Sequence, residues 1–91
     1  MTREVQLFKK KERRSLAEAA DFLRQLADKV EKGNVLLKQG TDEVNVELPA
    51  NVMLDVEFEH EQKPKKGLRH KLEIELKWYE GDDESGPLEL G

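Results

Sequence analysis

The clearest pattern of apolar and polar residues lies near the N-terminus and repeats every three or four positions. Ser15 and Glu18, three positions apart, match a capping box, and Gly33 suits the left-handed conformation that ends many helices. We therefore predict a helix over residues 15–32. The apolar residues that this spacing places on one helical face are Leu16, Ala19, Phe22, Leu23, Leu26, Ala27 and Val30.

The rest of the chain is typical of strands. A short apolar stretch at residues 5–8 precedes the helix, and apolar and polar residues alternate after it over 35–38, 44–48, 52–59 and 71–78. Pro49 ends the second of these alternating segments, because proline cannot donate to a sheet ladder. Residues 39–42 and 62–67 are predicted to form a turn and a loop.

The element order β-α-β-β-β-β predicts an α+β fold in which one amphipathic helix packs on one face of a five-stranded, mostly antiparallel, twisted sheet. Residues 1–79 would form a single domain, and residues 80–91 an acidic, disordered tail. The expected core comprises Val5, Leu7, Leu23, Leu26, Val46, Leu54, Val56, Phe58, Ile74, Leu76 and Trp78.

Composition narrows the class of protein. A chain of 91 residues with a net charge of −4 has room for one small domain, and without cysteine it has no disulfides, thiolate metal sites or cysteine nucleophiles. Its apolar runs fall short of the ~20 residues of a membrane span, and its N-terminus lacks the apolar stretch of a signal peptide. We expect a cytoplasmic protein.

Three segments resemble the amphi-Trp domain family. They are residues 15–28 (SLAEAADFLRQLAD), residues 46–49 (VELP) and the closing residues 72–78 (LEIELKW), and the resemblance extends from Glu4 to Trp78. It implies a small prokaryotic protein from a family defined by sequence, with no established activity and no catalytic residues to carry over.

The sequence does not favour an enzyme. A catalytic hydroxyl needs a base within hydrogen-bond reach, and Thr2, Ser15, Thr41 and Ser85 are not paired in sequence with one. The scattered glycines form no phosphate-binding loop. We expect neither catalysis nor a cofactor.

The last two predicted strands carry an acidic face formed by Asp55, Glu57, Glu59, Glu73 and Glu75. If Phe58 pairs with Leu72, acidic residues face each other across the strands, which costs a few tenths of a kcal/mol per pair. Lys71, Lys77, a cation or a basic partner would compensate for this repulsion. We interpret the face as a candidate interaction surface, with a purely solvating role as the alternative.

The same register places His60 opposite His70. Facing Cβ atoms lie about 4.5–5.5 Å apart, close enough for two imidazoles to share a metal ion. Two ligands are too few for a closed structural zinc site, and a partly exposed histidine pair at a hairpin mouth is the alternative.

Two basic segments, 9–14 and 63–71, are candidate sites for nucleic acid or another polyanion. Their candidate residues are Lys9, Lys10, Lys11, Arg13, Arg14, Lys65, Lys66 and Arg69. The acidic balance of the chain and its few aromatic residues weigh against nucleic acid.

The predicted sheet is wider than its helix. Five strands span about 24 Å, whereas one helix covers about 10–12 Å. The uncovered apolar side, including Leu76 and Trp78, would be covered by the tail, enclosed by a twisted sheet that closes around the helix, or buried against a second copy. We expect a homodimer, formed through this side or through an unpaired strand edge. The sequence therefore favours a non-enzymatic interaction or structural module with an acidic face, and polyanion binding is the alternative.

Overall fold

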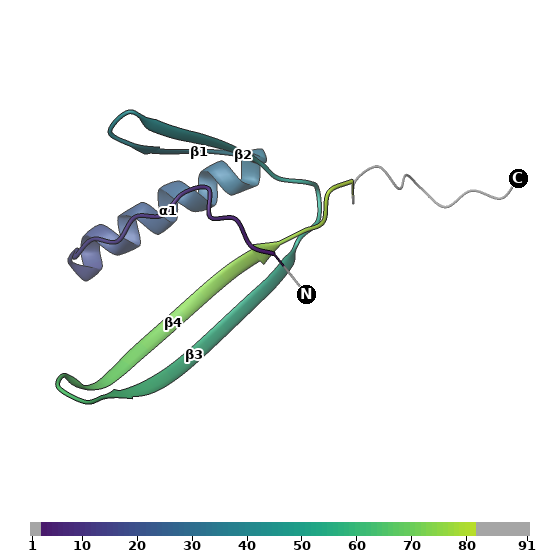
Figure 1. Cartoon of the computed structure of the whole chain (residues 1–91). Helices are drawn as coiled ribbons and strands as arrows, with labels where there is room; N and C mark the ends of the chain where they lie inside the picture. Colours follow the sequence, from purple (N-terminus) through teal and green to yellow (C-terminus); the bar gives the residue numbers. More distant parts are fainter. Residues whose placement is uncertain (1–2, 82–91) are drawn as a thin grey trace, which may run out of the picture. The chain divides into compact units, whose positions relative to one another are not determined.

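The computed structural model describes residues 3–81 and has an α+β architecture of one helix and four strands (Figure 1). The elements are α1 (Leu16–Lys32), β1 (Asn34–Gln39), β2 (Asp42–Glu47), β3 (Met53–Lys63) and β4 (Gly67–Lys77). The strands pair as two separate antiparallel hairpins, β1–β2 and β3–β4. The chain divides into two compact units, Met1–Leu48 and Pro49–Gly91.

Helix α1 begins and ends where its sequence predicts. The backbone N–H of Glu18 donates to the Ser15 hydroxyl at 3.1 Å, and the Glu18 carboxylate accepts from the backbone N–H of Ser15 at 3.4 Å. At the other end Gly33 has a φ of 83°, and its N–H donates to the carbonyls of Lys29 and Val30. The capping box and the left-handed glycine cap are both confirmed.

The β1–β2 hairpin packs against this helix within the first unit (Figure 1). Val35 pairs with Val46, and Leu37 pairs with Val44, so aliphatic residues from both strands share one face. Val35, only 8% exposed, is the sole buried residue within residues 3–81. A hydrogen bond of 2.8 Å from the Leu48 N–H to the Gly33 carbonyl joins the end of this hairpin to the end of the helix.

The second unit contains the long β3–β4 hairpin. Its eleven paired positions run from Met53 opposite Lys77 to Lys63 opposite Gly67, with Phe58 opposite Leu72. The register considered from the sequence is therefore confirmed. Both strands extend further toward the turn than predicted, because pairing continues through charged residues whose ion pairs span the ladder.

The prediction of a single five-stranded sheet is wrong. Residues 5–8 form no strand, and the four strands that do form make two sheets of two. Each hairpin joins strands that are consecutive in sequence, and a short turn closes a hairpin at a lower entropic cost than a distant pairing. Pro49, which has no N–H to donate, lies between the two hairpins.

The predicted core is also corrected. Leu26, Val46 and Leu76 are half-buried, but most of the predicted core residues are exposed in the described structure. The exposed members are Val5, Leu7, Leu23, Leu54, Val56, Phe58, Ile74 and, at the margin, Trp78. Alternation correctly sorted side chains onto faces, but it carries no information about what covers each face.

Two expectations remain predictions. A single domain over residues 1–79 and a cytoplasmic location are both untested, and the acidic tail lies outside the described residues from position 82 onward. Across residues 3–81, α1 is too polar to cross a bilayer as a membrane helix.

Candidate functional site

The β3–β4 hairpin has two chemically distinct faces. Side chains alternate between the two faces along each strand. The register places most apolar residues opposite apolar residues and charged residues opposite charged residues. One face carries the facing pairs Leu54–Leu76, Val56–Ile74, Phe58–Leu72, His60–His70 and Gln62–Leu68, and the other carries Asp55–Glu75, Glu57–Glu73, Glu59–Lys71 and Glu61–Arg69.

Within the second unit, as described up to residue 81, no other element covers the apolar face. Phe58 is 64% exposed and Leu72 is 67% exposed, and Leu54, Val56, Leu68 and Ile74 are each at least half exposed. Leu54, Val56, Phe58, Leu72 and Ile74 are neighbours on this face, whereas Leu68 lies beyond the His60–His70 pair, and an exposed contiguous apolar patch of this kind is unusual on a monomer. The sequence prediction assigned most of these residues to a core and so missed them as a surface.

The acidic residues of the opposite face are largely paired with two lysines. Lys71 Nζ lies 3.2 Å from a Glu73 carboxylate oxygen and 3.5 Å from one of Glu59. Lys77 contacts Asp55 in the same way and lies 3.7 Å from a Glu75 oxygen. The hydrogen bond to Glu73 raises the pKa of Lys71. The compensation expected from these two lysines is therefore present.

Glu57 differs from its neighbours on this face. It makes no ion pair with any residue from 3 to 81, although it faces Glu73 across the ladder. One carboxylate oxygen each from Glu57, Glu73 and Glu75 lie within 4.8 Å of one another. Because Lys71 and Lys77 already pair with two of these groups, the cluster by itself does not define a cation site.

The turn end of the hairpin is less basic than its sequence suggests. Glu61 lies 2.7 Å from both Lys63 and Arg69, and the hydrogen bond from Lys63 is the main cause of its lowered pKa. The single negative charge of Glu61 is thus shared between Lys63 and Arg69. Lys65 and Lys66, in the turn, make no ion pair within the described chain.

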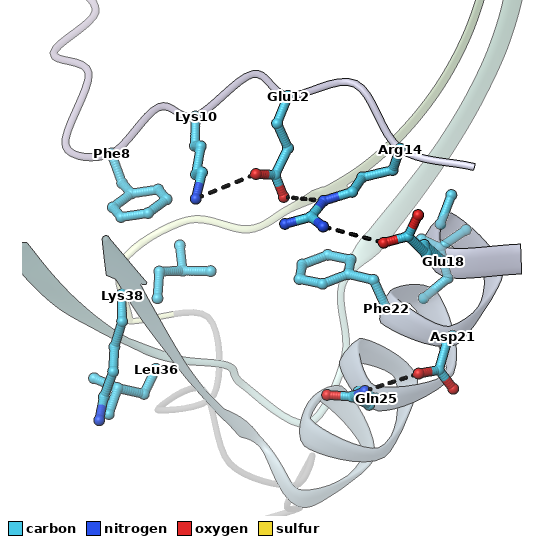
Figure 2. Close-up of a pocket in the computed structure, with 13 residues that line it drawn as sticks. Phe8, Lys10, Glu12, Arg14, Glu18, Asp21, Phe22, Gln25, Leu36 and Lys38 are labelled. Atoms are coloured by element: carbon cyan, nitrogen blue, oxygen red, sulfur yellow. Dashed lines mark hydrogen bonds and ion pairs between the residues drawn. The ribbon is translucent and has the colours of Figure 1, made fainter. Parts of the chain in front are cut away.

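The N-terminal basic segment lies beside an open groove of about 820 Å³ in the first unit (Figure 2). Glu12 accepts from Arg14 at 2.9 Å and lies 3.3 Å from Lys10, and Arg14 also contacts Glu18 at 3.1 Å. The hydrogen bond with Glu12 raises the pKa of Arg14. Lys9, Lys11 and Arg13 make no ion pair among residues 3–81.

The groove itself was not anticipated from the sequence. Phe22, Leu23 and Leu36 line it together with Phe8, and Figure 2 shows Phe22 extending from α1 toward the N-terminal segment. Phe8 and Phe22 are separated by fourteen positions, so only the path of the chain between them brings them to one groove.

The remaining candidate residues lie on the second unit. His60 and His70 face each other as predicted, with ring centroids 5.0 Å apart. Leu76 faces Leu54 and is half-buried, and Trp78 follows directly after β4. The structure thus groups the acidic residues on one face of the hairpin and places the two histidines side by side on the other.

Comparison with known proteins gives one match. The family model of the Amphi-Trp domain covers residues 1–91, which is the whole chain. No curated protein and no solved structure matches the chain.

Proposed function

We propose that this chain, which belongs to the Amphi-Trp domain family, is a non-enzymatic interaction module that self-associates through the apolar face of the β3–β4 hairpin. Family membership brings no activity with it, so the proposal rests on one observation. Six large apolar side chains from two strands form a continuous strip that is at least half exposed over most of its length.

A face of this kind requires a cover. An isolated two-stranded hairpin is marginally stable in water, and it gains stability when another layer buries its apolar side. The buried centre of a protein interface is mostly apolar, and the strip has that composition. A second copy supplies a strip of the same length, width and composition.

The helix of the same chain is a less suitable cover. The half-buried residues of α1 include Leu26 and Val30, and the β1–β2 hairpin already packs on this helix. Leu16, Phe22 and Leu23 are the large apolar side chains of α1 that remain more than half exposed. These three side chains are fewer than the six that form the apolar strip of the hairpin.

Association through the apolar face would leave the charged face outward. Glu57 lies on that face and makes no ion pair among the described residues. The neighbouring carboxylates of Glu73 and Glu75 are paired with Lys71 and Lys77. A partner that supplies a lysine or arginine to Glu57 would relieve its repulsion with Glu73. We propose that this face engages a basic segment of another protein.

The non-enzymatic character is part of the proposal. The Ser15 hydroxyl is already committed to the helix cap, where it accepts from the Glu18 N–H. Thr41 lies in the turn between β1 and β2, away from either histidine in sequence. The Ser15 hydroxyl also donates to the Glu18 carboxylate at 3.0 Å, and we assign this contact to the capping box rather than to the activation of a nucleophile.

The test is the solution mass of matched variants on the two faces of one strand. Ile74→Lys places a charge in the apolar strip, and Glu73→Lys places the same side chain on the opposite face. By light scattering we expect a dimer for the wild type and for Glu73→Lys, and a monomer for Ile74→Lys. A wild-type monomer with no concentration dependence, or equal behaviour of the two variants, would contradict the proposal.

Polyanion binding remains the second candidate because five residues of the basic segments 9–14 and 63–71 make no ion pair within residues 3–81: Lys9, Lys11, Arg13, Lys65 and Lys66. Against it, Glu12 and Glu61 hold Lys10, Arg14 and Arg69 in ion pairs. If it is correct, the affinity for a nucleic-acid duplex will fall steeply with salt and with neutralisation of Arg13.

A further inference from the structure

The β3–β4 hairpin holds both histidines of the chain side by side. His60 lies directly opposite His70 in the ladder, with ring centroids 5.0 Å apart, and both side chains are exposed. Three further residue pairs close the ladder between this position and the turn. The backbone therefore fixes the spacing of the two imidazoles.

We propose that His60 and His70 chelate one divalent transition-metal ion. Imidazole nitrogens prefer ions such as Cu²⁺, Ni²⁺ and Zn²⁺, whereas Mg²⁺ and Ca²⁺ prefer oxygen ligands. This site is separate from the acidic face and does not depend on self-association.

The separation of the rings fits a shared ion. With a metal–nitrogen bond of about 2.0–2.1 Å and a ring centre about 1.2 Å behind the nitrogen, each centroid lies about 3.2 Å from the ion. Two such centroids are about 4.5 Å apart at a right angle around the ion and about 5.2 Å apart at a tetrahedral angle. The observed 5.0 Å falls within that interval.

Phe58 positions one of the two rings. Its ring stacks on His70 with an interplanar angle of 8° and a centroid distance of 6.1 Å, and it meets His60 edge-to-face at 5.6 Å. The two imidazoles themselves cross at 78°. We assign His60, which lacks the stacking contact, as the ring that adjusts its side-chain torsions to direct a nitrogen at the shared ion, while Phe58 holds His70.

The surroundings leave the rest of the coordination sphere open. Glu59, Glu61, Arg69 and Lys71 lie on the opposite face of the ladder, where they pair with one another. On the histidine face, Gln62 is the adjacent polar side chain, beside the apolar Phe58, Leu72 and Leu68. Water or a ligand from another molecule would complete the coordination of the ion.

The experiment is a titration of the full chain with CuCl₂, NiCl₂ or ZnCl₂ in a buffer that does not chelate metals. We expect one ion per chain, bound most tightly for Cu²⁺, as the general affinity order of divalent ions predicts. His60→Ala and His70→Ala should each weaken binding roughly ten- to hundredfold, because the second imidazole acts at a high effective concentration.

A swap variant controls for misfolding and for histidine content. His60→Gln combined with Gln62→His keeps the composition and the face, but it moves one imidazole to a diagonal position about 7 Å from its partner. We expect this variant to fold, by circular dichroism, and to bind as weakly as the single-histidine variants. Binding as tight as that of the wild type would overturn the proposal.

The monomeric Ile74→Lys variant separates the two proposals. A site built within one hairpin binds one ion per chain whether or not the chain self-associates. One ion per chain in both proteins supports the chelate even if the wild type is itself a monomer. No saturable binding by the wild type overturns the chelate and leaves the self-association proposal untouched.

Discussion

The two hairpins of this protein share an alternating pattern and differ in what lies against them. Val35 in β1 and Val56 in β3 each face an aliphatic partner across an antiparallel ladder, Val46 and Ile74 respectively. Val35 is 8% exposed, because α1 packs on β1, whereas Val56 is 62% exposed. The same residue in the same local pattern therefore forms a core in one unit and a surface in the other.

The difference in burial between Val35 and Val56 is tested most strongly by the same substitution at both positions. Val35→Asp buries an unpaired carboxylate and should lower the free energy of unfolding of the first unit by about 3 kcal/mol. Val56→Asp should leave the helical signal of α1 unchanged and instead abolish self-association. Urea unfolding followed by circular dichroism, together with light scattering, checks both outcomes, and equal losses of helix stability would contradict the distinction.

A smaller effect is expected at the helix cap. Ser15→Ala removes the hydroxyl that accepts from the Glu18 N–H and should destabilise the first unit by about 1 kcal/mol. Ser15→Asp keeps an acceptor at this position and serves as the matched control. The urea midpoint should be lower for Ser15→Ala than for Ser15→Asp, and the β3–β4 hairpin should be unaffected in both.

Acid should weaken the same cap. The hydrogen bond from the Ser15 backbone N–H lowers the pKa of the Glu18 carboxyl below its ordinary value of 4.5. The stabilisation is therefore fully present above about pH 4.5 and is lost as the pH falls through the lower pKa of the folded state. Helical ellipticity followed against pH should fall less steeply for Glu18→Gln, and identical profiles for the two proteins would contradict this assignment.

The smallest effects are expected on the charged face of the second unit. Lys71→Gln removes the cation that lies against both Glu59 and Glu73, so it should lower the melting temperature at low salt. Glu57→Gln removes a carboxylate that has no ion pair within residues 3–81 and that faces Glu73. This substitution should raise the melting temperature at low salt. Both differences should shrink in concentrated salt, because exposed charges are screened.

Particular residues show how far the sequence could be interpreted. The capping box at Ser15 and the glycine cap at Gly33 are local motifs, and the helix they bound was predicted correctly. The pairing of Phe58 with Leu72 was considered as one possible register, since a shift by two residues also keeps apolar residues on one face, and the structure has this register. His60 and His70, and the acidic pairs, follow from that register.

Other features depended on distant parts of the chain. Residues 5–8 have the apolar content of a strand, but a strand must pair its backbone with another strand. In the described structure residues 5–8 form no strand. The groove that Phe8 and Phe22 line could not be predicted, since it depends on the path of the segment between them.

The helix with its caps, the turn between β1 and β2 and the chemistry of each strand face could all be predicted from the sequence, whereas the register of β3 with β4 was one of those that alternation allows. Those features depend on hydrogen bonds and side-chain periodicity within about thirty residues of chain, which local interactions suffice to specify. The tertiary structure alone decided that four strands make two sheets, and that Val35 is buried while Val56 is exposed. Burial depends on which surfaces meet, and a period of two is the same whether or not a face is covered.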